Sequence, residues 1–308
     1  MNIVVVIPAY KVKKYIENVV QNIPEFVTKI IVIDDGCPEH SGKYLESYDF
    51  DRVVVIHHEE NQGVGGAILS GYRKALELGA DIIVKVDGDG QMDPSYMEKL
   101  IAPLVKGKAD YTKGNRFKDF KALKAMPKVR LFGNSALSFL LKLSSGYWNI
   151  MDPTNGYTAI SKGALEGLDL NSISKRYFFE SDMLINLNIE NMIVKDVSIP
   201  AKYGDEESSL SIKKVLYQFP PKIFKGLARR IFYKYYIYDF NMASIYLLLG
   251  IPMLFCGVVF GIVKWVEAVN SGIETSAGTV MLAVLPIILG TQFLLQAISI
   301  DIENIPGK

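Results

Sequence analysis

The segment 85–94, K-V-D-G-D-G-Q-M-D-P, carries the side chains best suited to chemistry. Asp87, Asp89 and Gln91 stand at alternate positions with glycines between them, and Asp93 follows. Carboxylate and amide oxygens suit Mg²⁺ and Mn²⁺, which proteins commonly bind together with substrate phosphates. Glycines allow the backbone to turn and a substrate to approach closely. The segment therefore favours a site where a divalent cation bridges a nucleotide diphosphate and neutralises its charge as it departs.

Two other interpretations of this segment stay open from its residues alone. An EF-hand calcium loop over 87–98 would need glycine in place of Met92 and a helix before it, whereas residues 81–86 have the pattern of a strand. A solvated acidic turn is the second alternative. The pair Asp34-Asp35 favours the cation site, because carboxylates gathered at one edge repel each other unless a cation or ligand lies among them.

The elements that must position these side chains alternate along the N-terminal part of the chain. Continuous apolar runs predict strands covered on both faces at 2–7, 29–34, 52–57 and 81–86, and helical spacing predicts helices at 13–22 and 64–79. This alternation predicts an α/β fold with a mainly parallel sheet. Ligands of such sheets bind beyond the carboxyl ends of the strands, where the chain has Pro8-Ala9-Tyr10, Asp34-Asp35-Gly36 and Asp87–Gln91.

The glycine-rich segment 63–66 opens the second predicted helix. It does not match a dinucleotide-binding fingerprint, because Ile68 stands where the third glycine is required. It is therefore either a turn near a phosphate or sugar, or a purely structural turn.

The overall composition excludes some partners. The 308 residues include 34 basic and 33 acidic side chains, so net charge does not indicate nucleic acid as a partner. The two cysteines, Cys37 and Cys256, are not expected to form a disulfide, since Cys256 lies in a long apolar run, and this fits a reducing compartment. The N-terminal residues lack the basic region of a secretory signal.

Two uncharged runs near the C-terminus, 242–263 and 277–300, are each long enough to cross a hydrocarbon core of about 30 Å as a helix. The preceding residues 213–234 are rich in basic side chains and contain no acid: Lys213, Lys214, Lys222, Lys225, Arg229, Arg230 and Lys234. The positive-inside rule therefore predicts an inner-membrane or plasma-membrane protein with two spans and residues 1–240 in the cytoplasm.

Residues 222–235 have the pattern of an amphipathic helix. Ile223, Leu227 and Ile231 form one stripe, and lysines and an arginine form another. This pattern predicts an interfacial helix attracted to anionic lipid, with a plain helical linker as the alternative. The predicted organisation is a catalytic domain at 1–212, a basic amphipathic segment at 213–240, a two-helix membrane hairpin at 241–302 and a cytoplasmic tail at 303–308.

Several short motifs, in this order along the chain, resemble those of the family 2 glycosyltransferases with a GT-A fold. They are P-A-Y at 8–10, I-D-D-G at 33–36, D-G-D-G-Q-M-D-P at 87–94, G-N-R at 114–116, D-P-T-N-G-Y at 152–157 and F-F-E-S-D at 178–182. The resemblance covers about residues 1–210 and is specific as a set. Members that act on polyprenyl phosphates and carry a two-helix hairpin resemble the whole chain. The resemblance implies a membrane-bound inverting enzyme that moves one hexose from a UDP- or GDP-linked sugar to undecaprenyl or dolichyl phosphate.

The resemblance also implies roles for individual residues. Asp87 would lie beside the ribose and diphosphate and assist the metal, Mg²⁺ or Mn²⁺, which Asp89 and Gln91 would bind. Arg116 and Arg130 would hold the acceptor phosphate. The remaining donor-binding residues would be Pro8, Ala9, Tyr10 and Asp35 at the nucleoside, and Lys202, from the loop 202–210, at the diphosphate.

The expected catalytic groups are Asp89, Arg116 and Asp152, where Asp152 is either a base or an orienting carboxylate, with Glu180 and Asp182 behind it. A polyprenyl phosphate is already largely ionised at neutral pH, so it needs a base less than a hydroxyl acceptor does.

The chain departs from the family pattern at two places. Lys11-Val12 stand where Asn-Glu is usual, and Cys37-Pro38 stand where Ser-Thr is usual, so the identity of the donor is left open. Two alternatives remain: a family 2 transferase acting on a hydroxyl acceptor such as a lipid-linked sugar, and a non-catalytic membrane protein that binds a nucleotide sugar. The resemblance also implies a homo-oligomer packed through the membrane helices.

Overall fold

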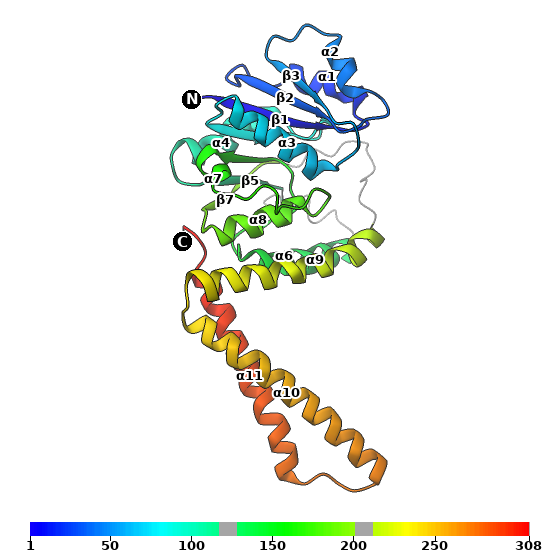
Figure 1. Ribbon diagram of the computed structural model, residues 1–308, viewed down its shortest axis with the longest axis vertical. Coiled ribbons are helices and arrows are strands. Elements are labelled where there is room, and N and C mark those ends of the chain that lie inside the picture. Colours follow the sequence, from blue (N-terminus) through cyan, green and yellow to red (C-terminus); the bar gives the residue numbers. More distant parts are fainter. Residues whose placement is uncertain (117–127, 201–211, 308) are drawn as a thin grey trace. The chain divides into compact units, whose positions relative to one another are not determined.

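The structure is a computed structural model that describes residues 1–116, 128–200 and 212–307, with the backbone alone at 128–136 and 212–216. The chain divides into two compact units (Figure 1). Residues 1–230, together with Gly307, form an α/β unit, and residues 231–306 form a helical unit. The two units are described separately below.

A seven-stranded sheet with strand order β3-β2-β1-β4-β6-β5-β7 organises the first unit. Among the strands that the structure describes, β6 alone runs antiparallel to its neighbours β4 and β5, so the sheet is mainly parallel, as predicted. The four N-terminal strands lie within two residues of their predicted positions. The strands are β1 Ile3–Ala9, β2 Lys29–Asp34, β3 Val53–His57, β4 Ile82–Lys85, β5 Tyr111–Asn115, β6 Thr158–Ser161 and β7 Val194–Ser198.

Helices cover both faces of this sheet, because alternate residues of the buried strands point to opposite sides. Val5 and Ile7 of β1 pack with α1 and α4 in one core cluster. On the other face α3 crosses so close to β1 that a Cβ at Gly71 would lie 2.2 Å from Val6 Cγ1. The helices are α1 Lys13–Gln21, α2 Ser41–Glu46, α3 Val64–Glu77, the 3₁₀ turn η1 Pro94–Tyr96, α4 Met97–Val105, α6 Lys128–Ser145, α7 Lys162–Glu166 and α8 Phe179–Ile189.

Helix α9, Ile212–Phe232, buries Ile223, a residue of the apolar stripe that its sequence shows. Ile223 is buried with Phe219 against Phe178 of the loop before α8, and Arg230 is buried as well. Tyr217 and Phe224 of this helix are 83% and 72% exposed. Ile223 of the predicted apolar stripe therefore completes the core of the first unit, and the interfacial position of the helix stays a prediction.

The second unit contains the π-helical turn η2, Tyr233–Tyr238, followed by a hairpin of two long helices, α10 Met242–Ser271 and α11 Ala277–Glu303 (Figure 1). Small residues let the two helices approach closely, since a Cβ at Gly290 would lie 2.6 Å from the backbone nitrogen of Leu254. The helices have mean hydropathies of 2.4 and 2.0 and are long and apolar enough to cross a membrane by length and composition. The N-terminus of α10 is closed by a capping box formed by Asn241 and Ser244.

Candidate active site

The predicted motifs meet at the carboxyl edge of the sheet. Ala9 at the end of β1 is paired with Asp34 at the end of β2, and Asp35 donates its backbone N–H to the Ala9 carbonyl at 3.1 Å. The loop after β4 reaches the same edge, since a Cβ at Gly88 would lie 3.1 Å from the Pro8 carbonyl oxygen. The local chain thus brings Pro8, Ala9 and the 87–91 segment together, as the parallel topology predicts.

A buried lysine supports the acidic segment from beneath. Lys85 of β4 is 1% exposed, and its Nζ donates to Asp87 Oδ1 at 2.6 Å and to the Gly156 carbonyl at 3.1 Å. It also lies 3.3 Å from Glu180 Oε1. Burial works against the charged form, but the carboxylates of Asp87 and Glu180 outweigh it and raise the pKa of Lys85. The charged ammonium of Lys85 therefore binds Oδ1 of Asp87, and Oδ2 of Asp87 faces Gly156.

Glycine is required at position 156 by this arrangement. A Cβ there would lie 2.5 Å from Lys85 Nζ, 2.7 Å from Asp87 Oδ2 and 3.1 Å from Met92 Cε. The glycine of the D-P-T-N-G-Y motif is thus explained by a close approach to the acidic segment.

Gln91 is the most exposed member of the predicted metal set, and Asp87 and Asp89 are half-buried. Asp89 Oδ1 accepts the backbone N–H of Gln91 at 3.0 Å, which tightens the turn, and Gln91 is exposed. Asp93 caps the following turn by accepting from Ser95 N at 2.9 Å, with Pro94 at the first position.

This oxygen-only donor set suits Mg²⁺ or Mn²⁺. Within the described parts of the chain no group of three or more His, Cys, Asp or Glu side chains is arranged to hold a metal. A metal ion at Asp87, Asp89 and Gln91 therefore stays a prediction, and such an ion would need its other ligands from a substrate diphosphate and water.

Asp35 is 2% exposed and holds a neighbouring loop with both of its oxygens. Oδ1 accepts from Gln62 N at 2.9 Å and contacts His58 Nδ1 at 2.8 Å, while Oδ2 accepts from Gly63 N at 2.8 Å. His58 Nε2 continues to Ser70 Oγ at 2.9 Å. Asp35 thus shapes the predicted nucleoside pocket through the 61–63 loop, and a direct contact with the nucleoside stays a prediction.

The glycine-rich segment 63–66 packs against another part of the chain. Gly66 N donates to the Lys175 carbonyl at 2.9 Å, and a Cβ at Gly65 would lie 2.5 Å from the Ser174 carbonyl oxygen. This contact favours the structural turn over the phosphate-binding turn.

Arg116 and Asp152 form a bidentate ion pair. Arg116 Nε donates to Asp152 Oδ2 at 2.8 Å, and Nη2 donates to Oδ1 at 3.2 Å. The Arg116 side chain is 43% exposed, whereas that of Asp152 is fully buried. Because Asp152 uses both oxygens to hold one guanidinium, the geometry favours an orienting carboxylate over a base.

Further polar groups lie buried behind this pair. Lys113 of β5 is fully buried, donates to the Asn155 carbonyl, and has its pKa lowered to about 8 by burial against the opposing pull of Glu180 and Asp152. Lys85, Lys113 and Gly156 were not found as site residues from the sequence. For Lys85 the sequence does contain an indication, because this lysine lies inside the otherwise apolar strand I-I-V-K-V. A buried strand tolerates a lysine only with acidic partners.

Two predicted phosphate-binding residues cannot be placed in the site. Lys202 and the loop 202–210 lie outside the described residues. Arg130 is on α6, and its side chain lies outside them too. Tyr10 is 43% exposed at the end of β1.

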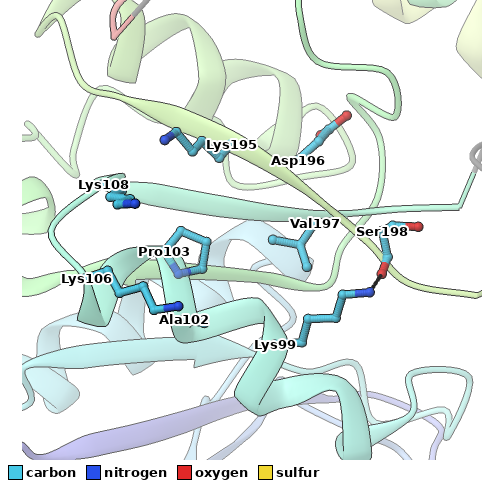
Figure 2. Close-up of a pocket in the computed structure, with 9 residues that line it drawn as sticks. All are labelled: Lys99, Ala102, Pro103, Lys106, Lys108, Lys195, Asp196, Val197 and Ser198. Carbon is cyan, nitrogen blue, oxygen red and sulfur yellow. Dashed lines mark hydrogen bonds between the residues drawn. The ribbon is translucent and has the colours of Figure 1, made fainter.

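A groove of about 410 Å³ runs between α4 and β7 and contains none of the predicted site residues (Figure 2). Its charged lining is Lys99, Lys106, Lys108, Lys195 and Asp196. Figure 2 shows Lys99 reaching the Ser198 carbonyl, a hydrogen bond of 2.8 Å. Because β7 is the last strand of the sheet, these lysines are well placed to discourage edge-to-edge pairing.

The mainly parallel sheet with helices on both faces is that of the GT-A fold, and the comparisons that follow show a glycosyltransferase. Residues 4–168 match the family model described as Glycosyl transferase family 2. The chain belongs to this family.

Three relatives illustrate the match. The UDP-N-acetylglucosamine–dolichyl-phosphate N-acetylglucosaminyltransferase of Methanococcus voltae is 36% identical over 66% of this chain and 86% of its own length. The polyprenol monophosphomannose synthase of Mycolicibacterium smegmatis is 29% identical over 67% of this chain and 79% of its own. The crystal structure of glucosyl-3-phosphoglycerate synthase from Mycobacterium tuberculosis with Mg²⁺ and UDP has a TM-score of 0.54 at 19% identity, covers 74% of this chain and 79% of that one, and supports the fold alone.

Proposed function

We propose that the protein transfers one hexose from a UDP- or GDP-linked sugar to a polyprenyl phosphate at a membrane, with inversion at the anomeric carbon. The observation that carries this proposal is the bidentate pair of Arg116 with the fully buried Asp152. A hydroxyl acceptor needs a general base, and Asp152, which the sequence left as either a base or an orienting carboxylate, is paired with Arg116. A phosphate monoester is already largely ionised at pH 7, so it needs a cationic clamp rather than a base.

One short turn links the donor and acceptor halves of the proposed site. At its start Asp152 orients Arg116, and at its end the Gly156 carbonyl accepts from Lys85, which holds Asp87. The turn therefore fixes the acceptor clamp relative to the donor-binding acid, and positioning of two anionic substrates is the main catalytic requirement here.

The residues would divide the work as follows. Arg116, with Arg130, would hold the acceptor phosphate so that one oxygen faces the anomeric carbon, and Lys202 would contact the donor diphosphate. Mg²⁺ or Mn²⁺, held by Asp89, Gln91 and Asp87 Oδ2, would neutralise the charge on the departing nucleoside diphosphate. Pro8, Ala9 and Tyr10 would line the nucleoside pocket.

Exposed apolar side chains on α6 and next to Asp152 in the chain support a lipid acceptor. Phe139 and Leu140 of α6, and Met151 next to Asp152, are 55%, 42% and 51% exposed. Trp148 stacks edge-on with Phe139, with ring centroids 5.9 Å apart. Such a group of exposed apolar side chains suits the isoprenoid units next to the phosphate.

Three features support a membrane location with the catalytic unit in the cytoplasm. Helices α10 and α11 are apolar enough to span a bilayer, and the basic residues cluster before them rather than in the hairpin loop. Tyr217 and Phe224 are exposed on α9, where Lys222 and Lys225 flank Phe224. Aromatic and basic side chains together suit the headgroup region of anionic lipid.

The decisive experiment incubates the full-length protein in membranes with labelled nucleotide sugars and either undecaprenyl or dolichyl phosphate. UDP-N-acetylglucosamine and GDP-mannose are the first donors to test. We expect a lipid product that releases its sugar in mild acid, and we expect chelator or Asp89→Asn to abolish it. A label found only in an acid-stable product would establish a hydroxyl acceptor. Binding of nucleotide sugar without any transfer would establish a non-catalytic protein.

A further inference from the structure

Asp196, in the middle of the edge strand β7, connects the two sides of the arginine clamp. Its Oδ2 accepts the backbone N–H of Met151 at 2.7 Å and the side-chain Nδ2–H of Asn115 at 2.9 Å. Met151 directly precedes Asp152, and Asn115 directly precedes Arg116. One carboxylate oxygen is therefore one residue away from each partner of the bidentate pair.

The other end of the same turn has a separate anchor. Asn155 Nδ2 donates to the Gly114 carbonyl at 2.8 Å, which ties the turn to β5 beyond Asp152. Asp196 binds the chain just before Asp152, and Asn155 binds β5 just after it. Without Asp196, the contacts that the described residues make between this segment and β5 would lie at Asn155 and beyond, so Asp152 and the guanidinium could shift together.

We propose that Asp196 is a positioning residue that sets the geometry of the Arg116–Asp152 pair and thereby the affinity for the acceptor phosphate. This inference rests on the proposed function. Asp196 does not touch the acceptor and acts through Asn115 and Met151.

The electrostatics of Asp196 argue against a role in stability alone. Its Oδ1 is buried without a hydrogen-bond partner in the described part of the chain. Burial raises the pKa of Asp196 to about 6, with Met151, Lys113 and Asn115 favouring the charged form and Asp152 opposing it. In Figure 2 the Asp196 carboxylate points away from the groove lysines Lys99, Lys106 and Lys108. A carboxylate this costly to bury is expected to serve the site rather than the fold.

The test compares three variants of the full-length protein in membranes: Asp196→Ala, Asp196→Asn and, as a matched control on the same strand, Lys195→Gln. Transfer rates are measured at pH 8 while undecaprenyl phosphate and the nucleotide sugar are varied separately. We expect Asp196→Ala to raise the acceptor KM about tenfold, the loss of roughly one charge-assisted hydrogen bond, with the donor KM within about twofold of the parent. Asp196→Asn keeps an oxygen at the same place and should recover most of the acceptor affinity, and Lys195→Gln should match the parent.

Amide hydrogen exchange gives a readout that does not depend on activity. The Met151 amide should exchange faster in Asp196→Ala than in the parent, and Asp196→Asn should restore its protection. An unchanged acceptor KM, or equal increases in donor and acceptor KM, would overturn the inference. If the parent protein makes no lipid phosphate product, the proposed function fails. In that case unchanged Met151 exchange in Asp196→Ala overturns the positioning role, and faster exchange supports it.

Discussion

Replacing Gly156 by alanine tests the link between the two halves of the site. The added Cβ would lie 2.5 Å from Lys85 Nζ and 2.7 Å from Asp87 Oδ2, against a normal contact of about 3.5 Å. Each group must therefore move by about 1 Å, and a displacement of that size in a positioning residue can lower a rate about 100-fold. Both obstructing atoms are at the ends of side chains, so we expect the stability to fall by only about 1 to 3 kcal/mol.

The assay is the rate of sugar transfer at saturating acceptor, together with thermal unfolding of the same preparation. Gly163→Ala is the matched control, because it makes the same chemical change where a Cβ would meet nothing within 4 Å. Gly163 lies in helix α7, so alanine there should leave the activity unchanged and raise the stability by up to about 1 kcal/mol. Gly156→Ala should keep its fold and lose turnover. Its KM for the donor should rise more than its KM for the acceptor, since Asp87 is the displaced acid.

The reasoning would be refuted by a Gly156→Ala protein with parental turnover and parental donor KM. It would also be refuted if turnover fell only in proportion to the folded fraction, because the loss would then report unfolding and not a displaced Asp87.

Three further predictions concern buried charge, pH and the membrane. Lys85→Met should destabilise the protein by about 3 to 5 kcal/mol, because it leaves buried carboxylates without a counter-ion. In thermal unfolding, the double variant Lys85→Met with Glu180→Gln should recover part of this loss. Strictly additive losses of stability would contradict the pairing of Lys85 with Glu180. Because burial raises the pKa of Asp196 from 3.8 to about 6, the folded protein holds that proton more tightly than the unfolded chain. The unfolding free energy of the parent, relative to that of Asp196→Asn, should therefore fall by about 2 to 3 kcal/mol as pH rises from about 4 to about 6, at about 1.4 kcal/mol per pKa unit. A difference in unfolding free energy that does not change with pH would contradict this. Phe224→Trp should add fluorescence that headgroup-region brominated lipid quenches, whereas Phe26→Trp, at a residue 40% exposed elsewhere on the unit, should not; unquenched fluorescence at 224 would contradict the interfacial position of α9.

The strands and their ligand-binding edge could be predicted because their signals are local. Each N-terminal strand is a continuous apolar run that ends in turn-forming and acidic residues, and parallel pairing brings these ends together. The glycine-rich segment 63–66 could not be resolved in the same way. Its close neighbours are Ser174 and Lys175, more than 100 residues further along the chain, and no local pattern records such a contact.

The residues that position the site could not be predicted from the sequence, for a related reason. Asp87 lies two residues after Lys85, so a strand period predicts that the two side chains share a side. Gly156 reaches Lys85 only because β6 inserts antiparallel beside β4, with Lys85 paired to Thr158. The same insertion places the 152–156 turn between Asp87 and Arg116, and the geometry of that turn favours the orienting role for Asp152. A motif therefore predicts which residues are candidates to contact the substrate, whereas the residues that fix their positions depend on which distant strands become neighbours.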